Sequence, residues 1–333
     1  MFRYKTNIII SSIITFLIIP NLLIAQKVEK IVWPSQPNEP KIEFLSSFSN
    51  SKDIGVKKSF LQNIWDRVTG NDLNEEMLVQ PIGVTGDNNG NVYVADPGTK
   101  SVHIFNQEKR SYSQIRGKRD NLFKSPIGVA ISELGLVYIT DSELGQIQVF
   151  NTQGDYQFTI KGYFERPTGI CINQNTIYVT DTGLHKIFVF SLEGNYIFEY
   201  GNLGSNLGEF NRPIFIYKKS LFYIADAMNY RVQVLDDGFN SLFTIGHQGD
   251  VQGTFSRPKG IAVDSDENIY VADGLFDAIQ IFNYTGELLL VFGKNGNGLG
   301  EFDMPAGIYI DNNDQIYIVD TLNRRVQVFK YLK

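Results

Sequence analysis

The side chains best suited to catalysis in this chain are its three histidines, because imidazole is both a common metal ligand and a common acid–base group. A metal site needs several ligands to converge on one ion. His103 lies in an expected strand, His185 in an expected turn and His247 after a strand, so the three share no position in the sequence pattern. The only cysteine, Cys171, lies in an apolar run that is typical of a buried small hydrophobe. We therefore expect no catalytic residue, no metal and no cofactor.

Six aspartates form the other set with chemical potential, since each one closes a short alternating apolar run. They are Asp96, Asp141, Asp181, Asp226, Asp273 and Asp320. Six carboxylates brought together could bind a cation, and that alternative stays open. A residue that recurs once in every repeat, however, usually meets a need of the repeat, here the hydrogen bonding of backbone N–H groups in the adjoining turn. We therefore expect a structural role for them, with Arg231 and Arg325 as ion-pair partners.

The elements that position these residues recur six times along the chain. Each repeat begins with a proline, and the six are Pro81, Pro126, Pro167, Pro213, Pro258 and Pro305. They are 41 to 47 residues apart. Each repeat contains short apolar strands joined by turns, such as the run 92–95 that Asp96 closes. A period in the forties built from four strands is typical of a β-propeller blade. The sequence therefore predicts an all-β, six-bladed propeller.

In five repeats a glycine stands two residues after the proline, whereas the fourth repeat has Phe215 there. We expect this glycine to permit either a close backbone approach or a positive φ near the crowded central channel.

Two segments upstream of the first repeat complete the expected fold. The last repeat stops at Lys333 after its third strand, and residues 42–48 are expected to supply the outer strand and close the ring. Apolar residues then recur at helical spacing over about 57–69, which predicts one inserted amphipathic helix. These residues are Phe60, Leu61, Ile64, Trp65 and Val68. The propeller is therefore expected to span 42–333.

The repeats resemble the NHL repeat. Their pattern of proline and glycine, a strand ending in aspartate and then Asn-x-Arg-Val-Gln-Val is clearest at 229–235 and 323–329. The resemblance covers about 42–333 and implies a binding scaffold, because NHL propellers are mostly protein-interaction modules, sometimes RNA-binding ones and occasionally sensors. One relative, the amidating lyase that opens peptidyl-hydroxyglycines, uses a metal held by histidine. The fold alone does not decide between these functions.

The N-terminus and the net charge bear on location and partners. Arg3 and Lys5 precede a largely apolar stretch that reaches Ala25, a pattern typical of a signal peptide over 1–25, followed by a linker over 26–41. We therefore expect a periplasmic or secreted protein. The alternative is an uncleaved anchor through residues 8–25, and only then would the chain contact a membrane. The formal net charge of −6 argues against nucleic acid as a partner.

The face that carries the turns between the second and third strands is expected to carry the function, because these turns differ from blade to blade. The predicted binding residues on it are Met228, Tyr230, Leu275, Phe276 and Arg324, with Trp65 at the margin. We expect a non-enzymatic monomer that binds a protein, peptide or glycan partner. Two alternatives remain open. The turn residues could instead pack against the inter-blade loops, and the chain could be a metal-dependent lyase or hydrolase with its site at the central channel.

Overall fold

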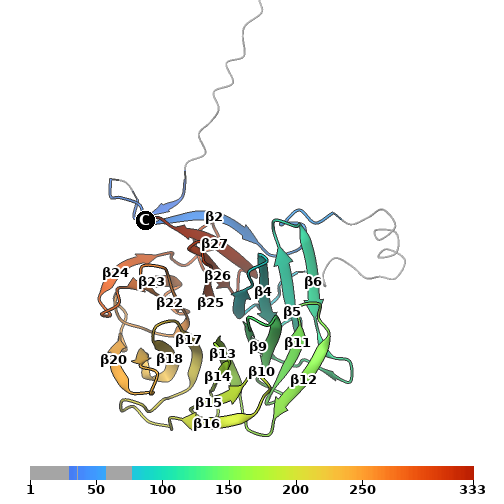
Figure 1. Cartoon of the computed structure of the whole chain (residues 1–333). Helices are drawn as coiled ribbons and strands as arrows, with labels where there is room; N and C mark the ends of the chain where they lie inside the picture. Colours follow the sequence, from blue (N-terminus) through green and yellow to red (C-terminus); the bar gives the residue numbers. More distant parts are fainter. Residues whose placement is uncertain (1–29, 36, 58–76) are drawn as a thin grey trace, which may run out of the picture. The chain divides into compact units, whose positions relative to one another are not determined.

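The computed structural model describes residues 30–35, 37–57 and 77–333. Ile31–Lys333 form one compact unit, in which antiparallel sheets are arranged as blades around a common centre (Figure 1). Five blades follow the chain in order: β3 (Gly83–Gly86), β4 (Asn91–Asp96), β5 (Ser101–Asn106) and β6 (Ser111–Ile115) in blade 1; β9 (Pro126–Ile131), β10 (Leu136–Asp141), β11 (Gln146–Asn151) and β12 (Tyr156–Lys161) in blade 2; β13 (Pro167–Asn173), β14 (Thr176–Asp181), β15 (Lys186–Ser191) and β16 (Tyr196–Tyr200) in blade 3; β17 (Pro213–Lys218), β18 (Phe222–Asp226), β19 (Arg231–Leu235) and β20 (Ser241–Ile245) in blade 4; β21 (Pro258–Val263), β22 (Ile269–Asp273), β23 (Ala278–Phe282) and β24 (Leu288–Phe292) in blade 5.

Blade 6 is built from both ends of the described chain, as the sequence predicts. It contains β25 (Pro305–Ile310), β26 (Gln315–Asp320) and β27 (Arg325–Tyr331), and then β2 (Ile42–Phe48), which pairs antiparallel with β27. A further short strand, β1 (Val32–Trp33), pairs with the outer edge of β2. The expected six-bladed propeller, closed by an N-terminal strand, is therefore confirmed.

The apolar core lies between the blades. Six clusters of buried apolar side chains are present, and each joins residues of two neighbouring blades. The second and third strands are consequently buried on both faces, as in β5, which is buried throughout, whereas the fourth strand of blade 3, β16, is mostly exposed. Such blade-to-blade packing explains why the inner strands are continuous apolar runs.

The glycine two residues after the proline is required by close backbone approach. A Cβ on Gly260 would lie 2.2 Å from the carbonyl oxygen of Ala306 in the next blade, and one on Gly128 would lie 2.3 Å from that of Thr168. Neither glycine has a positive φ. Of the two expected reasons, the crowding of backbones around the channel is therefore the one that applies. In blade 4 the side chain of Phe215 packs instead against the cluster between blades 4 and 5.

Several expectations for the N-terminal region concern residues outside the described part of the chain. The signal peptide over 1–25 lies outside it, and so do Trp65 and the helix expected over about 57–69, apart from Lys57, which is in no helix. Within the described residues the longest helix is the 3₁₀ turn η2 (Ala227–Asn229). No described helix has the length and hydrophobicity of a membrane span. The expected linker over 26–41 contains β1.

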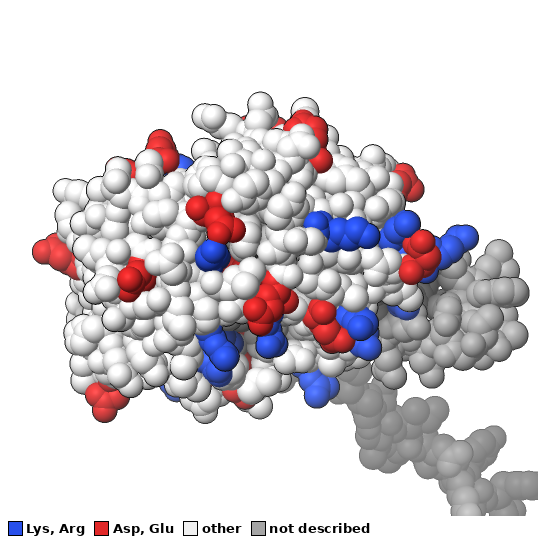
Figure 2. Space-filling model, turned by 90° about the horizontal axis from the view of Figure 1, so that it is seen from below, with Lys and Arg blue, Asp and Glu red and all other residues white. Residues whose placement is uncertain are grey.

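One further hairpin, β7 (Gly117–Lys118) with β8 (Asn121–Leu122), lies in the connection between blades 1 and 2. Charges of both signs are interspersed on the side of the molecule that Figure 2 shows. Some described side chains pair at the surface, for example Lys118 Nζ with Asp120 Oδ2 and Lys219 Nζ with Glu267 Oε1, each at 3.1 Å. Exposed pairs of this kind contribute little to stability.

Candidate functional site

The strand-ending aspartates are buried acceptors of backbone hydrogen bonds. Asp96 accepts the N–H groups of Val79 at 2.6 Å, of Gln80 at 3.0 Å and of Thr99 at 3.1 Å. Its carboxylate thereby joins the loop before the proline to the turn after the strand. Burial raises the pKa of Asp96, and these backbone bonds oppose the rise. The equivalent loops are held by Asp141, Asp181, Asp226, Asp273 and Asp320.

The two arginines expected to pair with these aspartates also hold a long loop in place. Arg231 Nε donates to Asp226 Oδ2 at 2.9 Å, while its Nη1 donates to the carbonyl of Ser205 at 2.8 Å. Gln233, two residues further on, accepts the N–H of Gly208 at 3.0 Å. Blade 6 repeats the arrangement with Arg325 and Gln327. These side chains therefore fix the inter-blade loops, among them the one that ends at residue 212.

The histidines occupy different structural positions. His103 is fully buried, with Nε2 2.8 Å from Thr99 Oγ1 and Nδ1 2.8 Å from the hydroxyl of Tyr112. Burial, with a smaller contribution from Arg116, lowers the pKa of His103 to about 3, so the ring is neutral. His247 is exposed in the loop before blade 5. Within the described residues no group of three or more His, Cys, Asp or Glu is placed to hold a metal ion.

Cys171 borders a cavity of about 170 Å³ inside the channel, which the innermost strands of all six blades line. Burial raises the pKa of its thiol, with a small opposing contribution from Lys218. A thiol that stays protonated is a poor nucleophile. The structure therefore gives Cys171 no reactive character.

The predicted binding residues lie at turn tips on the expected face but differ in accessibility. Met228 and Leu275 are exposed, and so is Arg324. Phe276 is half-buried, and Tyr230 packs partly against the cluster between blades 4 and 5. Trp65 lies outside the described residues. Of the described residues of this set, only Met228 lines the cavity described next.

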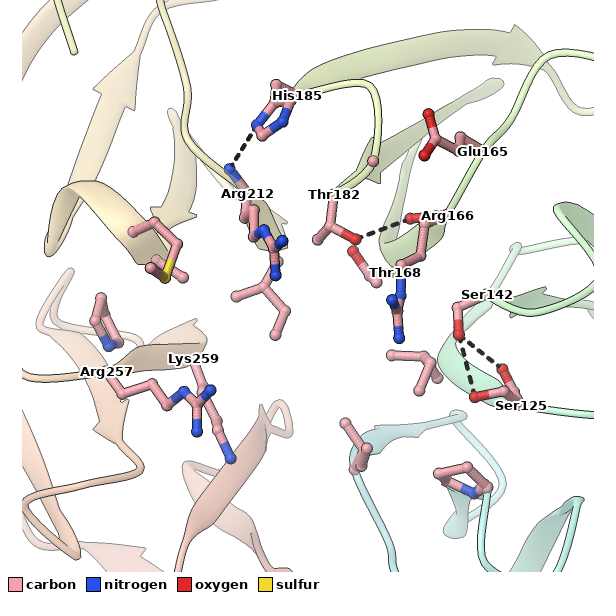
Figure 3. A pocket seen from close by; sticks show the side chains of 18 of the residues that line it. Ser125, Ser142, Glu165, Arg166, Thr168, Thr182, His185, Arg212, Arg257 and Lys259 are labelled. Atoms are coloured by element: carbon pink, nitrogen blue, oxygen red, sulfur yellow. Dashed lines mark hydrogen bonds between the residues drawn. The ribbon is translucent and has the colours of Figure 1, made fainter. Parts of the chain in front are cut away.

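A cavity of about 560 Å³ opens on this same face, at the end where the innermost strands begin. Four basic side chains from three successive blades line it: Arg166, Arg212, Arg257 and Lys259. The guanidinium groups of the three arginines extend toward the middle of the cavity, whereas the end of the Lys259 side chain lies against Gly274 and the carboxylate of Glu165 lies at the cavity's edge (Figure 3). The hydroxyl groups of Ser125, Ser142, Thr168 and Thr182 complete the polar part of the lining.

The arginines occupy one and the same position in their repeats, directly before the proline that begins the innermost strand. In blades 3 and 5 the N–H of this residue donates to the strand-ending aspartate, at 3.0 Å for Arg166 and 2.9 Å for Arg257. In blade 4 the residue has a positive φ of 56°, and the N–H of Arg212 donates instead to Nδ1 of His185 at 3.0 Å. The histidine of blade 3 thus positions an arginine of blade 4.

Lys259 lies deeper, between the proline and the glycine of blade 5, and is half-buried. Burial, and to a smaller extent the neighbouring Arg257, lower its pKa to about 8 against the opposing effects of Asp273 and Asp277. Keeping this ammonium group charged therefore costs free energy, and a bound anion would reduce that cost.

Sequence reasoning did not select these four residues, because it looked for large side chains at turn tips. A usable signal was present, since aligning the repeats places arginine before the proline in three consecutive blades, at 166, 212 and 257. The convergence of the side chains on one cavity could be seen only in three dimensions.

Comparison with known proteins supports the repeat assignment. A family model described as a 6-bladed beta-propeller matches residues 255–331, and the NHL repeat model matches 123–150 and 164–190. No curated protein matches the sequence significantly.

Solved structures with similar folds are numerous and differ in activity. Virginiamycin B lyase from Staphylococcus aureus has 16% sequence identity and a TM-score of 0.56, covering 76% of this chain and 96% of the lyase. An auxiliary nutrient binding protein from Bacteroides thetaiotaomicron has 15% identity and a TM-score of 0.61, over 78% of this chain and 71% of that one. A protein of unknown function from the same organism has 15% identity and a TM-score of 0.63, over 87% and 75%. At such identities the likeness shows the fold alone. Together with the six blades and the family matches, it identifies the chain as a six-bladed β-propeller that contains NHL repeats over 123–150 and 164–190.

Proposed function

We propose that this chain is a non-enzymatic binding propeller that recognises a protein, peptide or glycan partner through the face bearing the turns between the second and third strands. The observation that carries the proposal is the 560 Å³ cavity at the centre of that face. Loops from five blades line it, and the packed sheets hold these loops in place. Concave sites on loops that a rigid scaffold positions are typical places for binding.

The turns around the cavity also favour this face as the binding surface. Leu275 and Leu322 occupy turn tips in blades 5 and 6 and are more than half exposed, at 56% and 55%. Apolar side chains displayed on a soluble surface gain free energy when a partner covers them. The expected export through residues 1–25 would place the partner in the periplasm or outside the cell.

The similar folds leave the class of function open, since they include both a lyase and a protein described as nutrient binding. Metal-dependent lysis or hydrolysis would need histidines free to converge on an ion. Both ring nitrogens of His103 have hydrogen-bonding partners inside blade 1, and Nδ1 of His185 accepts the N–H of Arg212. These contacts favour binding over metal-dependent chemistry at these two residues.

Capture of partners from the native cell envelope tests the proposed face. The double variant Leu275→Glu/Leu322→Glu should lose the proteins or glycans that the parent captures, because it places charge on the contact surface. The control is Leu134→Glu/Tyr284→Glu, whose side chains are 75% and 69% exposed. These two lie in turns joining first to second and third to fourth strands, which are at the opposite ends of the strands. Both doubles should melt like the parent. Capture that survives the first double, or that both doubles abolish, would contradict the proposed face.

A further inference from the structure

We propose that the 560 Å³ cavity binds a small polyanion, a ligand that presents two or more carboxylate, sulfate or phosphate groups to Arg166, Arg212, Arg257 and Lys259. The inference rests on the proposed function and specifies the chemistry that this face recognises.

The four cations have few acidic neighbours among the described residues, although Asp273 and Asp277 favour the charged form of Lys259. Figure 3 shows the guanidinium groups of Arg166, Arg212 and Arg257 directed into the cavity from three sides. Glu165 is the one acidic residue among the described residues that line it. None of the four cations forms an ion pair with a described carboxylate. Like charges gathered with few counter-charges repel one another, and a bound anion would offset that repulsion.

The repeat itself shows that the fold does not require these arginines. The residue before the proline contributes its backbone N–H, which Gln80 and Ser125 also donate to the aspartates of blades 1 and 2. In blade 6 the N–H of Met304 donates to Asp277 at 2.8 Å. Glutamine, serine and methionine thus meet the same structural need. Three arginines at this position therefore call for another explanation, and a shared ligand provides one.

Lys259 is a further cation at a position of the repeat where the fold does not require a charge. The residue directly after the proline is Ile82, Ile127, Thr168, Ile214 or Ala306 in the other blades. Burying an ammonium group there costs free energy, and its pKa is lowered accordingly. In the other blades this position holds an apolar or small side chain. A charged residue there therefore indicates that the charge takes part in binding a ligand.

The geometry suits oxyanions in particular. Arginine presents a planar fork of N–H donors that matches carboxylate, sulfate and phosphate groups. The hydroxyl of Ser125, which accepts a hydrogen bond from Ser142 Oγ at 3.1 Å, adds a neutral donor beside the same space. The volume is in the range of small-molecule sites, so a compact anion fits better than a long acidic polymer. The whole chain carries a net charge of −6, so the cavity is a local exception to the charge of the molecule.

Isothermal titration calorimetry of the purified protein at low ionic strength tests the inference. Citrate, inorganic phosphate and sulfate are the probes and distinguish carboxylate from phosphate and sulfate recognition. Trimethyl citrate keeps the citrate skeleton without its charges. We expect at least one anion to bind with a Kd of about 1 mM or tighter and trimethyl citrate not to bind. Arg166→Gln/Arg257→Gln should weaken binding about 100-fold, about tenfold for each arginine.

The matched control is Lys100→Gln/Lys161→Gln, which removes two exposed cations outside the cavity lining and should leave affinity unchanged. Arg257→Gln alone is also measured, together with its melting temperature, so that unfolding is not mistaken for lost binding. The inference is overturned if no anion binds at about 10 mM, a concentration that already reports very weak affinity. It is equally overturned if both doubles bind alike or if trimethyl citrate binds as well as citrate. Envelope capture by Leu275→Glu/Leu322→Glu tests the proposed function alone, so the two claims can fail independently.

Discussion

At the scale of the residue, one turn position shows how the repeat combines a fixed backbone with free side chains. The last residue of the turn between second and third strands has a positive φ in all six blades: Lys100, Gly145, His185, Tyr230, Asp277 and Arg324. Only one of them is glycine, although the left-handed conformation costs other residues about 1 kcal/mol. In blades 3 and 5 the side chain of this residue accepts a hydrogen bond from the next blade. His185 and Asp277 accept the N–H of the pre-proline residue of the next blade, and that residue also has a positive φ.

The glycine beside the channel gives the first prediction at this scale. Gly260→Ala should destabilise the protein by about 3 kcal/mol or more, because the new Cβ would lie 2.2 Å from the carbonyl oxygen of Ala306 and backbone has to move. Urea unfolding monitored by circular dichroism measures the change. Gly238→Ala is the control, since Gly238 is exposed and a Cβ there would meet the end of a side chain, Asn240 Nδ2 at 3.1 Å, and no backbone atom. Equal effects of the two substitutions would mean that the channel is less crowded than the structure shows.

His103 gives the second prediction, which concerns pH. Its pKa is about 3 in the folded chain against 6.5 for the ordinary value, so below pH 6.5 the unfolded chain binds a proton that the folded chain does not. The free energy of unfolding should therefore fall on acidification, by about 1.4 kcal/mol per pH unit at most, with no contribution above pH 6.5. His103→Gln, which places there the residue found at the matching position of blades 2, 4, 5 and 6, should remove this slope.

Unfolding free energies at pH 6.5 and 5.0 measure the difference. The parent should lose about 2 kcal/mol more than His103→Gln over this interval. The exposed His247 is the control, because His247→Gln should keep the slope of the parent. If the free energy of unfolding depended on pH equally in the parent and in His103→Gln, protonation of the buried ring would carry no cost in free energy.

At the scale of the element, the inner strands were predictable and the shortest ones were not. The apolar run at 92–95 became β4, because a strand buried on both faces leaves a continuous apolar signature in the sequence. By contrast, β1 and the β7–β8 hairpin have two residues per strand, too few for any periodicity. The cavity was missed for a related reason. Its arginines belong to a loop position whose backbone role is constant, so their common direction depends on how the blades are arranged in the ring.

The sequence was enough to predict which face carries the cavity, but it did not predict the residues that line the cavity. Chain direction alone places the turns between second and third strands at the same end as the loops between blades, and the cavity lies at that end. Which turn residues are accessible depends on local packing instead. Tyr230 is partly covered by the cluster between blades 4 and 5, whereas Met228, two residues earlier, is exposed.

At the scale of the whole molecule, the ring has six blade interfaces, and one of them is closed by residues from opposite ends of the chain. The cluster at that interface joins Phe48 of β2 to Val326 of blade 6 and to Phe105 of blade 1. The rings of Phe48 and Phe105 are 4.8 Å apart. Ile42 of β2 packs in the cluster between blades 5 and 6 as well, so only the remaining four interfaces join neighbours in sequence alone. Closure therefore depends on long-range contacts, and their loss would expose the edge of β27 in blade 6 and an apolar face of blade 1.

Truncating Phe48 tests how far the ring depends on this closure. Phe48→Ala should lower the free energy of unfolding by about 3–5 kcal/mol, because it empties a fully buried site at the interface between blades 6 and 1. Leu45→Ala, on the same strand but exposed, is the matched control and should cost less than about 1 kcal/mol. If closure acts on the whole ring, one cooperative transition should shift to lower urea in Phe48→Ala. A separate early transition would instead show that blade 6 opens alone and that the remaining blades are stable without it.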